Sequence, residues 1–176
     1  MDRAIIGFDV GIRNMSFCEM TVDGSGSFAV KRWEVVDLMG GDLASANKIN
    51  LEELHQKVEL FLLANFPADL AVNAIGIELQ PQGRLSNLRM QIVSHLIYAF
   101  FRTKLNRGEI DSVRFISAKL KYPKKHMLAC GLKSSRVYKE RKRNSVALCR
   151  HLTPGLPAKG KLDDLADSFL IAHACV

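Results

Sequence analysis

The stretch AIIGFDVG at residues 4–11 decides the expected fold. It is a short apolar run with β-branched residues that closes at Gly11, a pattern typical of a buried strand. Asp9 lies inside this run, where a carboxylate is costly unless something pairs with it. Gly7 and Gly11 have no side chain and leave room for another backbone or a ligand to approach. We therefore expect a central strand that carries a functional acid.

The segments after this strand predict a sheet followed by helices. Residues 15–22 and 28–36 favour two more strands, and the turn between them makes a three-stranded antiparallel meander. Apolar spacing and β-branched runs predict the remaining elements: a helix over 51–66, a strand over 71–79, a helix over 85–105, a strand over 113–117, a basic helix over 136–152 and a helix over 162–175. This order predicts one α/β domain over residues 1–176, with a mixed sheet flanked by helices.

Further acids repeat the pattern of Asp9. Glu78 lies near the end of the apolar strand AIGIEL, and the last helix opens with KLDDLAD. Asp164 and Asp167 are three positions apart and share one helix face, although Asp163 and Asp167, four positions apart, would also share a face. Each acid alone is explained by a turn, a buried arginine pair or the helix dipole. Two buried strands and one helix that all supply acids nevertheless favour a common site.

Converging carboxylates would repel one another unless divalent cations lay between them. Oxygen ligands select hard ions, so Mg²⁺ is expected and Mn²⁺ is a substitute. Two such ions about 3.5–4 Å apart stabilise the attacking water and the leaving oxygen of phosphodiester hydrolysis. The acids therefore predict a nuclease.

Basic residues are concentrated in one segment of the chain. The net charge is +7, and residues 119–161 hold 13 of the 25 Lys and Arg but only one acid, Glu140. A solvated basic face or a targeting signal would explain such a run. Its density favours a nucleic-acid partner, because Lys and Arg neutralise phosphates and release counterions. Within this segment, Tyr122-Pro123 forms either a simple turn or a platform for an unpaired base.

Several classes of protein are disfavoured by the sequence. No apolar run approaches the ~18 residues needed to span a membrane, and no signal-peptide pattern opens the chain. The four cysteines form no C-x-x-C pair, which favours reduced thiols in an intracellular protein over a disulfide framework or a zinc knuckle. A sugar-kinase-like phosphotransferase would need a second lobe and a phosphate loop, and the sequence has no such loop.

Four motifs, in order, resemble the RuvC-like Holliday junction resolvases of the RNase H-like superfamily. The resemblance is to those of poxviruses and other large DNA viruses in particular, and to their mitochondrial relatives in fungi. The motifs are IGFDVGIRN at 6–14, IELQPQGRLSN at 77–87, YKERKR at 138–143 and DDLADSF at 163–169. The resemblance implies an RNase H-like five-stranded sheet, two Mg²⁺ ions per active site, and a homodimer that makes paired, symmetric cuts in four-way DNA junctions. For a viral protein it also implies action in the viral replication compartment, in the cytoplasm or the nucleus.

The same resemblance implies roles for particular residues. The metal ligands are expected at Asp9, Glu78, Asp164 and Asp167, with Asp163 as the competitor of Asp164. A catalytic basic residue near the scissile phosphate is expected at Lys139 or Lys142, with Lys119, Lys121 and Lys133 as competitors. DNA contacts are expected from Arg13, Arg84, Asn87, Lys119, Lys121, Lys124, Lys125, Lys133, Arg136, Arg141 and Arg143.

The long helix expected over 85–105 bears on assembly. It is apolar on more than one side, with Ile97 expected to face outward, so it predicts a dimer interface beside a core face.

Two other functions stay open. One is an RNase H-like nuclease for RNA–DNA hybrid, flap or other branched DNA, because the acids would perform the same chemistry there. The other is a non-catalytic nucleic-acid-binding module, although a decayed enzyme should have lost one of the acids.

Overall fold

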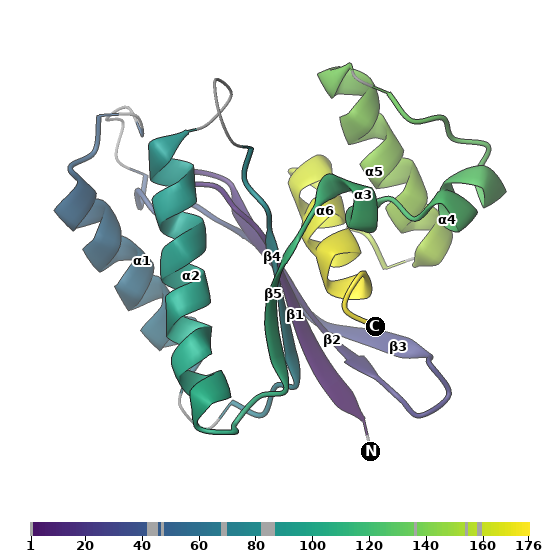
Figure 1. Ribbon diagram of the computed structural model, residues 1–176. Helices are drawn as coiled ribbons and strands as arrows, with labels where there is room; N and C mark the ends of the chain where they lie inside the picture. The colour runs from purple at the N-terminus through teal and green to yellow at the C-terminus, as the bar shows by residue number, and fades with distance from the viewer. Residues whose placement is uncertain are drawn as a thin grey trace.

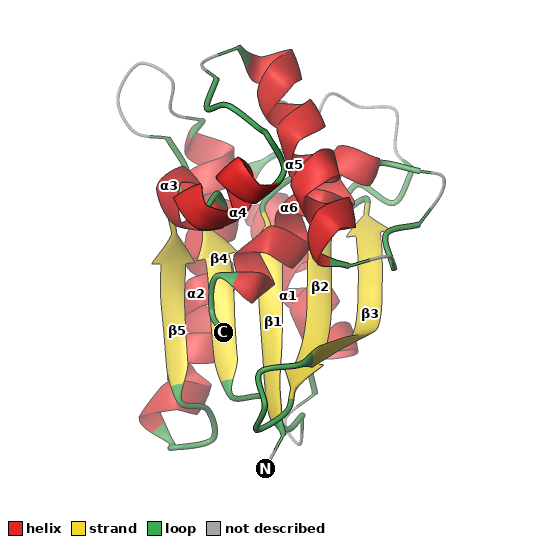
Figure 2. Ribbon diagram, turned by 90° about the vertical axis from the view of Figure 1, so that its right-hand side faces the viewer, coloured by secondary structure: helices red, strands yellow, loops and turns green. Residues whose placement is uncertain are grey.

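One mixed sheet forms the centre of the molecule. The computed structural model describes residues 2–41, 46, 48–67, 70–81, 87–135, 137–153, 155–157 and 160–176. The strands are β1 (Arg3–Asp9), β2 (Met15–Val22), β3 (Phe28–Val36), β4 (Ala74–Glu78) and β5 (Ser112–Ile116). They lie in the order β3-β2-β1-β4-β5 (Figure 2). The first three strands are antiparallel, whereas β4 runs parallel to β1 and β5 parallel to β4. The predicted mixed sheet is thereby confirmed.

Helices cover both faces of this sheet (Figure 1). The helices are α1 (Leu51–Asn65), α2 (Leu88–Asn106), α3 (Ala118–Lys121), α4 (Lys124–Ala129), α5 (Tyr138–Leu152) and α6 (Leu162–His173). α1 and α2 lie on one face, and α3 to α6 lie on the other. The short helices α3 and α4 were not predicted. No helix in the described part of the chain is long and apolar enough to cross a membrane.

The core beneath α1 and α2 is built on aromatic rings. Phe66 lies at the centre of this core, with ring-centroid distances of 5.3 Å to Phe8, 5.3 Å to Phe17 and 5.6 Å to Phe101. Ile97 is fully buried in the same core. The expectation that Ile97 faces outward is therefore wrong. The reason is that Val93, Ile97 and Phe101 recur every four residues on α2, and this stripe faces the sheet.

α6 packs directly on the sheet over two glycines. A Cβ atom built on Gly7 would lie 2.3 Å from the backbone nitrogen of Ala172, and one built on Gly76 would lie 2.8 Å from the Sγ atom of Cys175. Gly7 and Gly76 are neighbours in the parallel pairing of β1 and β4. This confirms the expectation that Gly7 allows a close backbone approach, and it fixes how near the acids of α6 come to the strand ends.

Candidate active site

Three acids meet where two parallel strands end. Asp9 is the last residue of β1 and Glu78 is the last residue of β4. Phe8 pairs with Ile77 in the parallel register, so the two acids emerge side by side. Asp167 comes from α6, and its carboxylate completes the group. One ligand atom from each of Asp9, Glu78 and Asp167 lies within 4.8 Å of the others.

The first turn of α6 is held over the sheet by two hydrogen bonds to its backbone. The Ser16 hydroxyl on β2 donates to the carbonyl oxygen of Asp164 at 2.5 Å. The Trp33 indole nitrogen on β3 donates to the carbonyl oxygen of Leu165 at 2.7 Å. These bonds, together with the glycine contact, set the position of Asp167 relative to Asp9.

Asp9 carries the electrostatic cost of this arrangement. Its exposed fraction is only 8%. Burial is the main reason why the pKa of Asp9 is raised well above its ordinary value, and the negative charges of Glu78 and Asp167 raise it further. A bound dication would remove this penalty, because it favours the charged form of every carboxylate around it.

Lys121 supplies positive charge to the same group of acids. It lies on α3, only 4% exposed, with its Nζ atom 3.1 Å from Glu78 Oε1 and 3.0 Å from Asp167 Oδ2. Burial alone would lower the pKa of Lys121, but the carboxylates of Asp167 and Glu78 outweigh burial and raise it. The side chain is therefore an ammonium ion. Of the lysines considered for a catalytic role, this one contacts two of the three clustered acids.

The two lysines that the sequence favoured for this role, Lys139 and Lys142, lie on α5, and Lys142 lines the cleft that holds the acids. Lys142 contacts the carboxylate of Asp163, and its Nζ atom lies 3.2 Å from Asp164 Oδ1. Asp164 is 9% exposed and lines the same cleft as the three clustered acids. Asp163 lies outside the residues that line this cleft. Lys139 is exposed and also lies outside them.

Two of the clustered carboxylates, Asp167 and Glu78, each accept a hydrogen bond from a neighbouring polar side chain. The Tyr122 hydroxyl donates to Asp167 Oδ1 at 3.4 Å and lies 2.5 Å from the Ser145 hydroxyl. Burial, followed by the nearby Asp167 charge, raises the pKa of Tyr122, so the phenol keeps its proton. The Gln80 side chain donates to Glu78 Oε2 at 3.1 Å. Such partners usually fix the direction of metal ligands. Sequence reasoning missed Ser145 and Gln80, because isolated polar residues give no periodic signal.

The acids lie in a cleft of about 610 Å³ whose walls carry basic and amide side chains. The expected DNA contacts on these walls are Arg13, Asn87, Lys121 and Arg141. Lys119, Lys124 and Lys133 instead line a second cavity. Lys125 and Arg143 are exposed outside both. Arg84 and Arg136 lie outside the described residues.

The residues at this site fit a divalent cation. All ligand atoms are carboxylate oxygens, the donor type that selects hard ions. Their separation is short enough for a single ion to contact all three, and the buried acid gains most from a dication. The group formed by Asp9, Glu78 and Asp167, with Asp164 beside it in the cleft, could therefore hold a divalent cation.

The solved structures that resemble this chain include Holliday junction resolvases. No protein-family model and no curated protein matches the sequence. The yeast mitochondrial Holliday junction resolvase Ydc2 is 18% identical, with a TM-score of 0.64 over 98% of this chain and 78% of that one. Thermus thermophilus RuvC, solved in complex with a Holliday junction substrate, is 20% identical, with a TM-score of 0.55 over 99% of this chain and 92% of that one. The chain thus has the RuvC-like fold over nearly its whole length.

Proposed function

We propose that this chain is a Holliday junction resolvase, a metal-dependent endonuclease that makes paired, symmetric cuts in four-way DNA junctions. The observation that carries the proposal is the group formed by Asp9, Glu78 and Asp167 within 4.8 Å at the floor of a cleft with basic walls. The fold shared with Ydc2 and RuvC supports the substrate class. The motif resemblance to resolvases of large DNA viruses supports a viral subtype acting in a viral replication compartment.

The chain's own residues supply binding and orientation. Asp9, Glu78, Asp167 and Asp164 would hold two Mg²⁺ ions, or Mn²⁺ in their place. When bound, such ions stabilise the developing charge of phosphodiester hydrolysis. Lys121 places a fixed positive charge beside these acids, where it can bind the scissile phosphate. The basic residues on the cleft walls bind neighbouring phosphates and hold the strand in place.

A cleavage assay tests this proposal directly. A labelled synthetic four-way junction, a linear duplex, a flap and an RNA–DNA hybrid are each incubated with the protein, with and without Mg²⁺. We expect paired cuts in the junction alone, and only with the metal. Preferred cutting of the hybrid or the flap would assign the site to another nuclease activity. Binding without any cutting would identify a non-catalytic module.

Salt should weaken junction binding steeply. A face that neutralises roughly six phosphates loses on the order of a thousandfold in affinity between 50 and 200 mM salt. Neutralising Lys139, Arg141 and Lys142 together should flatten the log–log slope by about three. The measurement is fluorescence anisotropy in EDTA. A control triple variant at Lys31, Arg102 and Arg107 removes the same charge from exposed positions on β3, α2 and the end of α2. If the two triple variants gave equal slopes of log affinity against log salt concentration, the DNA would not bind along the face formed by Lys139, Arg141 and Lys142.

We further propose a homodimer that uses the outer side of α2. A four-way junction has approximate two-fold symmetry, so a two-fold dimer presents one metal site to each of the two strands to be cut. Sedimentation at micromolar concentration should give about twice the 19.6 kDa chain mass. Because Ile97 is buried, Ala99, exposed near the middle of α2, is the position to change.

Ala99→Glu should lower the sedimenting mass and turn paired cuts into single nicks. Ala64→Glu, at an exposed position near the end of α1, is the matched control and should leave both unchanged. A stable monomer of the unaltered protein that still makes paired, symmetric cuts would contradict the dimer.

A further inference from the structure

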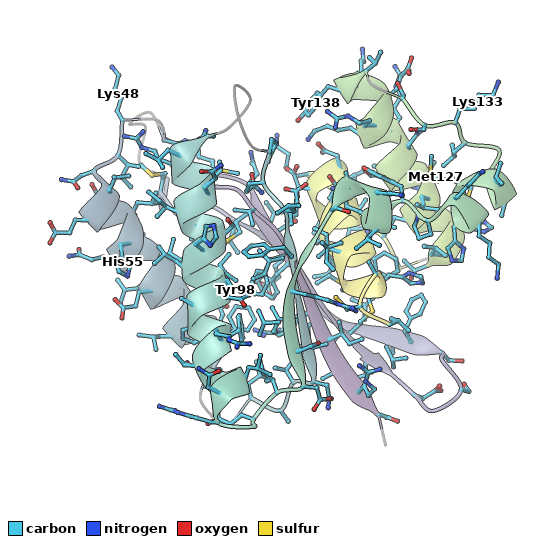
Figure 3. The ribbon with its side chains drawn as sticks, viewed as in Figure 1. Lys48, His55, Tyr98, Met127, Lys133 and Tyr138 are labelled. Atoms are coloured by element: carbon cyan, nitrogen blue, oxygen red, sulfur yellow. The ribbon has the colours of Figure 1, made fainter. Side chains whose placement is uncertain are left out.

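A second cavity adjoins the cleft that holds the acids. It measures about 650 Å³ and lies between α3, α4, α5 and the loop over 130–135. Ala118, Tyr122 and Arg141 line both cavities, so they form the wall between them. Figure 3 shows Met127 and Lys133 on one side of α5 and Tyr138 on the side that faces α2. The volume is in the range of cavities that hold small organic molecules.

The lining of this cavity combines apolar walls with a basic rim. The walls include Met127, which is 8% exposed, and Leu128, an apolar side chain that is 67% exposed to solvent. The rim carries the cations Lys119, Lys124 and Lys133. A nucleotide has the matching chemistry, because its base has apolar faces and its phosphate is an anion. A purely apolar ligand would gain no attraction from these exposed cations.

Hydrogen bonds connect the residues that form the walls of the cavity. The hydroxyl of Tyr122 contacts Ser145 and Asp167, which favours the orientation of its ring along the wall. The loop is fixed as well: the Leu132 nitrogen donates to the Met127 carbonyl at 2.9 Å, and the Asn144 side-chain nitrogen donates to the Lys133 carbonyl at 2.8 Å. A preformed cavity loses little entropy when a base enters it.

We propose that this cavity receives one unpaired base of the DNA strand whose backbone lies in the acidic cleft. The substrate strand comes from the proposed function, and the cavity adds a base-binding subsite to it. Tyr122 connects the two, because one side chain lines the subsite and hydrogen-bonds to the metal-site acid Asp167. A base that enters the cavity therefore sets the position of the strand relative to the acids, and the cutting position should depend on a base at a fixed distance from the cut.

Asn144 is the residue placed to read the edge of that base. It lines the cavity, and its amide nitrogen donates one of its two hydrogens to the Lys133 carbonyl. Its amide oxygen accepts no hydrogen bond from any residue that the structure describes, so it is free to accept one from a base amino group.

The test couples a change in the cavity to a change in the DNA. Leu128→Ser removes part of the apolar wall at an exposed position, and Leu60→Ser removes an equally exposed leucine (67%) from α1. Each protein is titrated in EDTA with intact junctions and with junctions that carry one abasic site, moved stepwise outward from the branch point. For the wild type, one abasic position should weaken binding about tenfold, the loss of one stacked base. Leu128→Ser should bind the intact junction about as weakly as the wild type binds the junction with that abasic site. The abasic site should then weaken the binding of Leu128→Ser only a little further.

Two results would overturn the subsite. One is an abasic penalty of the same size in wild type and Leu128→Ser at every position. The other is an equal effect of Leu60→Ser. A second wall variant, Leu132→Ser, repeats the comparison independently. Cleavage is followed in parallel with Mg²⁺, so the two proposals fail separately. An abasic penalty that depends on the wall variant, without any cleavage, disproves the proposed reaction. Cleavage with an abasic penalty that is independent of the wall variant disproves the subsite.

Discussion

Asp9→Asn should lower the rate of junction cleavage by at least about a thousandfold, because losing a metal ligand removes several kcal/mol of charge stabilisation. Binding should be largely unchanged, since the basic walls of the cleft stay in place. The rate is measured under single-turnover conditions in Mg²⁺ and the affinity by anisotropy in EDTA. Asp2→Asn, at an exposed position, is the control. Cleavage by Asp9→Asn at a near wild-type rate would show that Asp9 is no metal ligand.

The same substitution should stabilise the metal-free protein. Because the pKa of Asp9 is raised in the folded state, the native protein keeps a proton that the unfolded chain releases. Native stability should therefore fall as the pH rises from about 3.9, the ordinary Asp value, through the raised folded pKa. Asp9→Asn removes this loss. At pH 7 in EDTA its Tm should exceed that of the wild type by about 2–4 °C for each kcal/mol recovered, as calorimetry would measure. A lower Tm would contradict the assigned charge repulsion.

Lys121→Met should have the opposite effect on the metal-free protein. It leaves the acids around it without their buried cation, and breaking such a pair costs about 3 kcal/mol or more. The Tm in EDTA should fall by on the order of 10 °C. Saturating Mg²⁺ should recover much of this loss, because the dication replaces the missing charge. Lys125→Met, an exposed neighbour on α4, should change little in either condition. An equal fall with and without Mg²⁺ would mean that Lys121 does not compensate the metal-site acids.

Long, periodic elements were predictable from the sequence alone. The expected bounds of β2 and β3 are those of the structure, and α6 begins at the expected residue. The convergence of Asp9, Glu78 and Asp167 was also predictable, because parallel strands end at one edge and a helix face presents acids three positions apart. Their role as metal ligands stays a prediction.

The position of Lys121 could not be read from the sequence. It lies on α3, which has only four residues and therefore no apolar period to detect. Its burial depends on β5, which runs parallel to β4 and directs α3 towards the end of that strand. The sequence also did not reveal which side of α2 faces the sheet, because apolar residues cover more than one side of this helix. Only the packing on β4 and β5 selects the stripe that contains Ile97.

The docking of α6 on the sheet has a consequence for the order of events in the cell. The hydroxyl of Ser16 and the carbonyl oxygen of Asp164 form a hydrogen bond although the residues are 148 positions apart in the chain. A contact of such long range forms slowly, because a large loop must close first. During synthesis the segment around Asp9 and Glu78 leaves the ribosome long before Asp167 does. A nascent chain therefore exposes an acidic pair that lacks its third member, and the proposed nuclease site is complete only when α6 has emerged and docked.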